Sequence, residues 1–233
     1  MSARLEPEHF ARVLAARTDR DLDPVKSLCL ACTDVLGVSG AGLMLGSRGR
    51  SLGCVGVSDH VTETVEQVEF TVGEGPCVAA FRTKMPVFDP DLADDGAVQW
   101  SEFRRGALAA GVRAAFGFPL FVDKVCIGVL NLYHDRSGAL TDDQVGDALV
   151  VAQFAGRILL NWQADAPPGM VAWQLEKVPN HRMQVHQATG RVSVQAGISL
   201  ADALVLLRAY AFAENRPITA VAADVANERL RFD

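Results

Sequence analysis

The segment from residue 182 to residue 231 carries the signals that most restrict how this chain folds. Ser199 stands before an apolar periodic run, and Asp202 follows three residues later, a pattern close to the capping box that starts a helix. The apolar positions after it have the spacing of one helical face: Leu200, Ala203, Leu204, Leu207 and Ala211. Pro217 suits the first position of another helix, where its missing N–H costs nothing. The segment is therefore predicted to form two short helices, separated by a turn at 214–216.

A longer helix is expected upstream, from about residue 173 to residue 195, with Gly197 just after its end. Pro179 falls inside this range and should break the helix near Val178, because proline in a helix interior costs about 3 kcal/mol. Before it, the run Gln163-Ala-Asp-Ala-Pro-Pro-Gly169 has the composition of a domain linker. We therefore divide the chain into residues 1–165 and residues 166–233.

The helices of the C-terminal domain have small residues at their contact positions: Ala188, Gly190, Ala196, Ala203 and Ala211. Small side chains let helices approach closely but bury little area, and burial stabilises by only about 25 cal/mol per Å². A bundle of this size gains little from burial alone. We expect it to depend on a second copy of the chain or on the preceding domain.

Residues 1–165 have the pattern of a different fold class. Helices are predicted at 7–16, 24–36, 59–69, 76–82, 99–110 and 141–162. Strands are predicted at 41–46, 51–57, 85–88, 114–122 and 125–134. The helix at 59–69 should bury Val61, Val65 and Val68 on one side. This order indicates an α+β domain in which helices pack on an antiparallel sheet.

Two family resemblances rest on ordered sets of motifs. Residues 20–163 resemble a GAF domain, a cytoplasmic sensor fold related to PAS domains, through Gly73-Glu-Gly-Pro-Cys77, Pro86-Val-Phe-Asp-Pro-Asp-Leu92, Phe116-Gly-Phe-Pro-Leu120 and Ile127-Gly-Val-Leu-Asn-Leu-Tyr133. The last quarter of the chain resembles an ANTAR domain, a small all-α three-helix RNA-binding module, through Gln187-Ala-Thr-Gly190, Gly197-Ile-Ser-Leu-Ala-Asp-Ala203, Leu206-Leu-Arg-Ala-Tyr210 and Arg216-Pro-Ile218. Together they resemble the actinobacterial GAF–ANTAR regulators of transcription antitermination.

The ANTAR resemblance implies a function without catalysis. The tail would bind tandem stem-loops in nascent RNA and so disfavour a terminator hairpin, and two stem-loops call for a homodimer. Arginines supply phosphate contacts, and an aromatic ring can stack on a base. The residues assigned to RNA contact are Arg182, Ala188, Thr189, Arg191, Arg208, Tyr210 and Arg216. Thr189 stands where ANTAR domains generally carry lysine, which removes one positive charge.

The GAF resemblance implies a pocket between the sheet and the helices around residues 59–110. Its predicted lining is Phe88, Trp100, Phe116, Phe118 and Asn131. Such a pocket with few polar groups suits an unknown small-molecule ligand, and the same residues also suit a filled core. No cofactor is expected. The second hypothesis for the whole chain is a small-molecule or redox sensor whose C-terminal helices only mediate dimerisation.

Enzymatic and metal chemistry find little support in the sequence. The glycine-rich stretch at 73–77 lacks the lysine and the Ser or Thr of a phosphate-binding loop. Cys77, at a predicted helix start, would be a redox sensor if its pKa were lowered, and a GAF-type sulfoxide reductase would use Cys77 and Cys126. Cys29 and Cys32 have metal-type spacing, but no second Cys or His pair accompanies them. We expect neither a catalytic site nor a metal site.

Charge and hydropathy bear on where the protein works. The formal charge is −6, yet residues 171–233 carry seven Lys and Arg against six Asp and Glu, so the tail is less acidic than the rest. The N-terminus lacks an apolar signal core, and no run approaches the roughly 18 apolar residues of a membrane span. Five cysteines among apolar neighbours fit reduced thiols. We therefore expect a cytoplasmic protein with no membrane partner.

Overall fold

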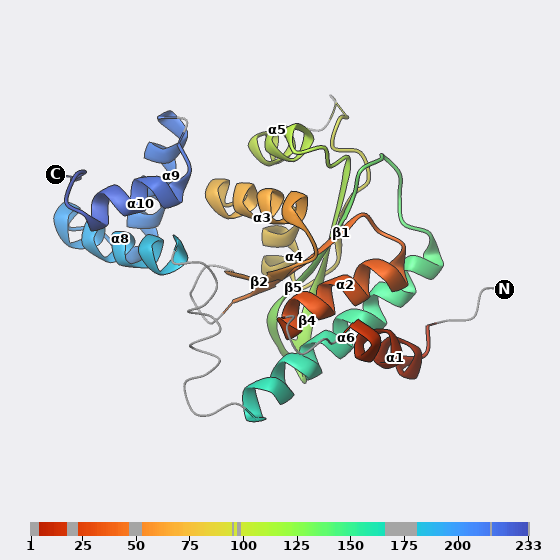
Figure 1. Ribbon diagram of the computed structural model, residues 1–233. Coiled ribbons are helices and arrows are strands. Elements are labelled where there is room, and N and C mark those ends of the chain that lie inside the picture. Colours follow the sequence, from red (N-terminus) through yellow and green to blue (C-terminus); the bar gives the residue numbers. More distant parts are fainter. Residues whose placement is uncertain are drawn as a thin grey trace. The chain divides into compact units, whose positions relative to one another are not determined.

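The computed structural model describes residues 5–17, 23–46, 53–94, 96, 99–165, 181–214 and 216–232. The chain divides into two compact units, and the division along the sequence falls between Pro167 and Pro168. Each unit is described by itself, with the element labels of Figure 1.

The first unit is built on a five-stranded sheet. Its strands are β1 (Gly40–Leu45), β2 (Gly53–Val57), β3 (Val87–Asp89), β4 (Ala114–Val122) and β5 (Val125–His134). They lie in the order β2-β1-β5-β4-β3, and every neighbouring pair is antiparallel. The predicted antiparallel α+β fold is confirmed.

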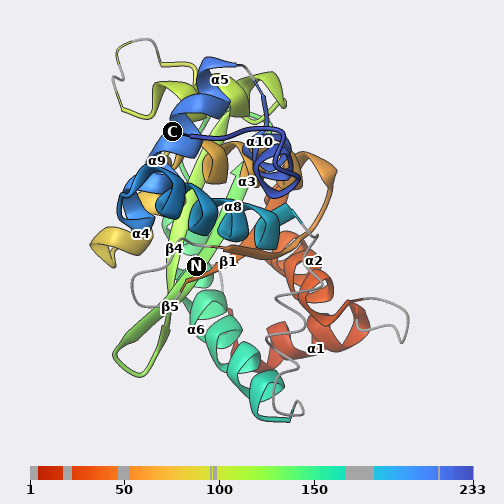
Figure 2. The same ribbon diagram turned by 90° about the vertical axis from the view of Figure 1, so that its left-hand side faces the viewer.

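Helices cover both faces of this sheet (Figures 1 and 2). On one face lie α1 (Pro7–Arg17), α2 (Pro24–Leu36) and α6 (Asp142–Asp165), and on the other lie α3 (His60–Val72) and α4 (Pro76–Thr83). Next to α3 is α5 (Ser101–Ala109). The hydrophobic core fills the first face and includes Phe10, Leu28, Leu43, Phe118, Leu130 and Val151.

The start and end of α2 follow the sequence signals closely. Asp23 is the N-cap, and its Oδ1 accepts a hydrogen bond from the Val25 N–H at 2.7 Å. Pro24 occupies the first helical position, and Gly37 ends the helix in the left-handed region with φ of 63°. Each residue therefore has the role that its conformational preference predicts.

The pleat of the sheet decides which residues meet which helices. On β4, Phe116, Phe118 and Leu120 point into the core on the side of α2 and α6. Gly117 points the opposite way, because successive side chains of a strand alternate between faces. A Cβ at Gly117 would lie only 2.9 Å from the Pro76 carbonyl oxygen, so α4 rests directly on the backbone of β4.

The second unit contains α8 (His181–Ala196), α9 (Leu200–Ala213) and α10 (Ile218–Ala226). The Ser199 cap is confirmed, since its Oγ accepts a hydrogen bond from the Asp202 N–H at 3.1 Å. Pro217 is the N-cap of α10 instead of its first helical residue. The core of this unit includes Val185, Ala188, Val192, Ala203, Leu207, Ala211, Ile218, Val221, Ala222 and Val225. Residues 166–180, with Pro179 and the predicted linker, lie outside the described residues.

In the described part of the chain, no single helix has both the length and the apolar composition to cross a membrane. One helix pair, Gln187–Ala196 with Leu200–Ala213, meets both criteria when taken together, and it is bent by 103°.

Candidate functional site

Two of the residues predicted to contact RNA are buried packing positions. Ala188 and Thr189 on α8 are 0% and 6% exposed. The Thr189 Oγ1 donates a hydrogen bond to the Val185 carbonyl oxygen at 2.7 Å, one helical turn earlier. Both side chains therefore pack inside the second unit, and their assignment to RNA contact stays a prediction. The side chain of Arg182, near the start of α8, lies outside the described residues.

Two of the remaining predicted contacts, Arg216 and Tyr210, have partners within the second unit. Arg216 pairs with Asp224 at 2.5 Å, and the ring of Tyr210 packs edge-on against Phe232 with centroids 5.3 Å apart. Arg208 lies two residues before Tyr210 on α9, and residues at that spacing point to different sides of a helix.

Arg191 is exposed on α8 and has a structural role. Its Nη1 donates to the carbonyl oxygen of Ala226 at 2.9 Å and lies 3.4 Å from that of Val225. Both carbonyls belong to the last turn of α10, whose final C=O groups have no partner further along the helix. A guanidinium at that end also complements the helix dipole, so Arg191 ties α8 to α10.

Beside Arg191, α8 and the segment after α10 enclose an open groove. It is lined by Gln187, Gly190, Arg191, Val194, Gln195, Glu228 and Arg231. A Cβ added at Gly190 would have no atom within 4 Å, so the glycine opens onto free space. The groove brings together two guanidinium groups, two amides and one carboxylate.

Of these groove residues, only Arg191 was predicted from the sequence to contact RNA. Gly190 was expected at a contact between helices and instead opens onto free space. The groove residues on α8 could have been found from the sequence, because positions 187, 190, 191 and 194 have the spacing of one helical face. Arg231 had no such signal, since it follows the last helix in an irregular segment. That segment is held near α8 by a hydrogen bond from the Phe232 N–H to the Gln195 Oε1 at 3.3 Å.

In the first unit, the predicted ligand pocket is divided between the two faces of the sheet. Phe88 packs against Phe116 and Phe118, with ring centroids 5.9 and 5.3 Å away, on the side of α6. Asn131 pairs in register with Gly117 and therefore lies on the side of α3 and α4. Trp100 is at the N-terminal end of α5 with φ of 57°. The structure therefore does not bring the predicted lining residues together on one face of the sheet.

Asn131 instead belongs to a buried polar cluster beneath α3 and α4. Its Nδ2 donates to the Glu66 Oε1 at 2.8 Å, and the Tyr133 hydroxyl donates to the same oxygen at 3.2 Å. Gly42 on β1 makes room for this carboxylate, since a Cβ there would lie 2.2 Å from it. The apolar spacing of α3 predicted Val61 on its inner side, but Val61 is 45% exposed.

The same cluster includes Glu69 and Cys77. The Glu69 Oε1 accepts hydrogen bonds from the Cys77 N–H at 2.7 Å and the Val78 N–H at 3.2 Å. Burial, with further contributions from Glu69 and Glu66, raises the pKa of the Cys77 thiol well above its ordinary value. The Cys77 Sγ contacts the Met44 Sδ at 3.1 Å. Cys77 is therefore a buried thiol and lacks the lowered pKa that a redox sensor at a helix start requires.

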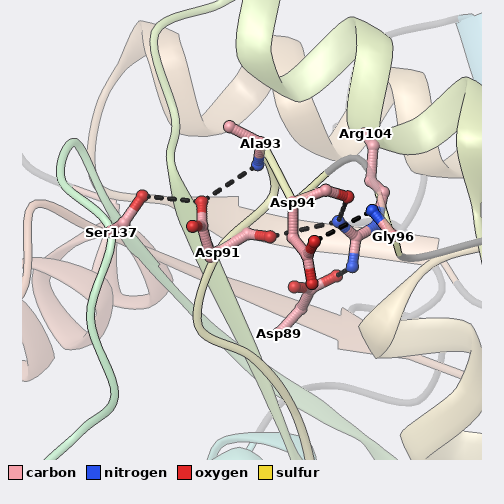
Figure 3. A network of polar contacts seen from close by, with 7 residues as sticks. All are labelled: Asp89, Asp91, Ala93, Asp94, Gly96, Arg104 and Ser137. Atoms are coloured by element: carbon pink, nitrogen blue, oxygen red, sulfur yellow. Dashed lines mark hydrogen bonds and ion pairs between the residues drawn. The ribbon is translucent and has the colours of Figure 1, made fainter.

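A second polar network anchors the loop between β3 and α5 (Figure 3). Arg104 on α5 forms an ion pair with Asp89 and donates to the Asp91 carbonyl oxygen at 3.1 Å. The Asp91 Oδ1 accepts hydrogen bonds from the Ser137 hydroxyl at 2.8 Å and the Ala93 N–H at 3.1 Å. The network joins the loop both to α5 and to the segment after β5.

Among the described residues, no group of three or more His, Cys, Asp or Glu could hold a metal ion.

Comparison with known proteins assigns the first unit to a family. Residues 25–159, more than half of the chain, match the GAF domain, and the chain therefore belongs to the GAF family. Membership of this family indicates a sensor or regulatory role. No curated protein matches the chain.

Solved structures with a similar fold have low sequence identity. The GAF domain of an Acinetobacter phosphoenolpyruvate-protein phosphotransferase is 12% identical with a TM-score of 0.49, over 68% of this chain and 94% of that one. A GAF domain/HD domain protein from Geobacter sulfurreducens is 11% identical with a TM-score of 0.48, over 61% and 94%. A free methionine-R-sulfoxide reductase from Thermoplasma acidophilum is 14% identical with a TM-score of 0.45, over 59% and 92%.

Proposed function

We propose that this chain is a regulator in which the GAF domain controls RNA binding by the C-terminal three-helix unit, acting in transcription antitermination. The observation that carries the proposal is the groove along α8, where Arg191 and Arg231 flank the open position at Gly190. Further support comes from the succession α8, α9 and α10 with its Ser199 cap, which agrees with the ANTAR resemblance.

The groove has the chemistry that a nucleic-acid backbone requires. Guanidinium groups bind phosphate oxygens with paired, charge-assisted hydrogen bonds, and amide side chains such as Gln187 and Gln195 can donate to phosphate or to base edges. The missing side chain at Gly190 lets a ligand approach the helix closely. This contact surface replaces the earlier set that included Ala188 and Thr189.

The modest charge of the groove sets an expectation for affinity. Arg191 already binds carbonyls of α10 and lies 3.8 Å from Glu228, so part of its charge is compensated. One unit should therefore bind one stem-loop weakly. Two units in a homodimer, each on one of two linked stem-loops, would gain affinity through effective concentration. Occupied stem-loops would then compete with formation of a terminator hairpin.

The proposal is tested by filling the groove without disturbing the fold. Gly190→Glu places a carboxylate in open space within a helix, where glycine is the weaker helix former by about 1 kcal/mol relative to alanine. Gly146→Glu is the matched control, because Gly146 lies in α6 and also has no atom within 4 Å of an added Cβ. Binding is measured by electrophoretic shift of an RNA with two linked stem-loops at fixed salt.

Gly190→Glu should weaken RNA binding about tenfold or more, which corresponds to about 1.4 kcal/mol, whereas Gly146→Glu should bind like the wild type. Gly190→Lys should bind more tightly. Equal binding by all four proteins, or no binding by the wild type, would contradict the proposed interface.

A second candidate function is a sensor whose C-terminal helices only mediate dimerisation. One observation favours it: Leu200, Val205 and Phe212 on α9 are 63%, 62% and 55% exposed. A helix that is apolar all round is usually covered by a partner. Under this alternative, Val205→Asp should convert a dimer to a monomer in sedimentation experiments, and the wild-type protein should shift no stem-loop RNA.

A further inference from the structure

A side chain of α3 caps the N-terminus of α4. The residue before α4 is Gly75, which has no side chain to accept the free N–H groups of the first turn. The Glu69 Oε1 takes that role, with the Cys77 N–H at 2.7 Å and the Val78 N–H at 3.2 Å. Glu69 is only 1% exposed, so this link between the two helices is made inside the domain.

Around Glu69, the buried polar groups offer more hydrogen-bond acceptors than donors. The Glu69 Oε2 is buried and receives no hydrogen bond from any described residue, and the same holds for the Asn131 Oδ1. The donors that reach the cluster, from Asn131 and Tyr133 of β5, bond to Glu66. A buried acceptor without a donor is costly, and one additional proton would supply the missing donor.

The charges around Glu69 are also unbalanced. Glu66 lies three residues earlier on α3, a spacing that places two side chains on one helical face. Cys77 of α4 donates its N–H to Glu69, and its thiol contacts Met44 of β1. Asn131 and Tyr133 of β5 bond to Glu66. Glu66 is the charged group that acts on Glu69, and its charge is of the same sign. Two buried like charges at this range disfavour joint ionisation.

We propose that Glu69 holds a proton in the folded domain at neutral pH, and that this proton makes the contact between α3 and α4 responsive to pH. A proton on Oε2 converts that oxygen to a donor and leaves Oε1 as acceptor for the first turn of α4. The cap therefore persists in the protonated state. Loss of the proton leaves two buried carboxylates side by side and favours entry of water between the helices.

The direction of the pH dependence follows from the environment of Glu69. Burial, reinforced by the charge of Glu66, raises the pKa of Glu69 well above its ordinary value, and the two backbone N–H groups oppose that rise. When folding raises the pKa of an acid, the folded state is most stable at pH values below the pKa of that acid in the unfolded chain. That stability falls as pH rises through the interval up to the folded pKa. The α3–α4 contact should therefore loosen on the alkaline side.

The test is an NMR titration of the full chain with 13C-labelled glutamate, from about pH 5 to about pH 9. One carboxyl should titrate far above the range of an ordinary glutamate. Glu69→Gln, which keeps the acceptor for α4, should lose that titration, and Glu8→Gln on the exposed side of α1 should retain it.

Glu66→Gln provides a second variant that does not depend on the folding of Glu69→Gln. Removing the neighbouring charge should move the Glu69 titration to lower pH without abolishing it. The proposal is overturned if every carboxyl of the wild type titrates in the ordinary range, if the high titration persists in Glu69→Gln, or if Glu66→Gln leaves it where it was.

Discussion

The guanidinium of Arg104 lies 2.6 Å from the carboxylate of Asp89, with side chains only 11% and 5% exposed. This pair connects α5 to β3, one of the two edge strands of the sheet. Burial raises the pKa of Asp89, and the charge of Arg104 opposes that rise. Because Arg104 also donates to the Asp91 carbonyl oxygen, one side chain fixes both the end of β3 and the loop that follows it.

Arg104→Ala should destabilise the first unit by about 3–5 kcal/mol, because it leaves the Asp89 carboxylate buried without its partner. The matched control is Arg105→Ala, since Arg105 pairs with Glu102 on the exposed side of the same helix. That variant should cost about 1 kcal/mol or less. Chemical denaturation of the full chain, followed by circular dichroism, measures both. Equal losses of stability in the two variants would contradict the structural role of the buried pair.

Gly117→Ala should also destabilise the first unit, by about 1–3 kcal/mol, because the fit between α4 and β4 leaves no room for a methyl group. The added Cβ would lie 2.9 Å from the Pro76 carbonyl oxygen and 3.1 Å from the Ala80 Cβ. Gly146→Ala in α6 is the control, and there the methyl enters open space. It should raise the stability by up to about 1 kcal/mol. Gly117→Ala should therefore lower the free energy of unfolding and Gly146→Ala should raise it. Changes of the same sign would contradict the close fit of α4 on β4.

The sheet explains why the fold could be predicted from the sequence although the ligand pocket could not. The strands and hairpins follow from runs such as 114–122 and 125–134, whose length and composition are local properties. The pocket residues needed the register, because Asn131 opposite Gly117 faces α4 whereas Phe116 and Phe118 face the core. A sequence pattern does not by itself specify which positions of two strands are paired.

The orientation of α3 was missed for a related reason. Hydrophobic periodicity favoured Val61 as an inner residue, yet the helix turns Thr62, Glu66 and Glu69 toward the sheet. Glycines on β1 permit this, because a Cβ at Gly40 or Gly42 would lie 2.2 Å from the Thr62 Oγ1 or the Glu66 Oε1. The helix orientation therefore depends on two glycines about twenty residues away in the chain.

Ser199→Ala should destabilise the second unit by about 1 kcal/mol, since the Asp202 N–H loses its hydrogen-bond acceptor. Ser199→Gly should cost only a few tenths of a kcal/mol, because glycine also suits the cap position. Hydrogen exchange at the Asp202 amide reports the loss directly and does not require the two units to unfold together. Unchanged protection in Ser199→Ala would show that the cap adds nothing to α9.

The helices of the second unit were predictable, and its surface was not. Caps and apolar spacing gave α9 and α10, because these signals lie within a few residues of each other. The roles of the arginines depend on tertiary contacts, such as Arg216 with Asp224 and Arg191 with the end of α10. Counting positive residues in the tail could not separate those that hold helices together from those that remain available to a ligand.

Arg231→Ala provides the most selective test of the proposed RNA interface. Arg231 lines the groove, whereas Arg229 is also exposed, carries the same charge and does not line it. If the groove binds phosphate, Arg231→Ala should reduce the slope of log K against log salt by about 1, and Arg229→Ala should leave it unchanged. Neither arginine caps a helix, so folding should be intact in both, unlike an Arg191→Ala variant. Equal slopes in the two variants would mean that the tail attracts RNA only by its overall charge, and the groove would then lose its assigned role.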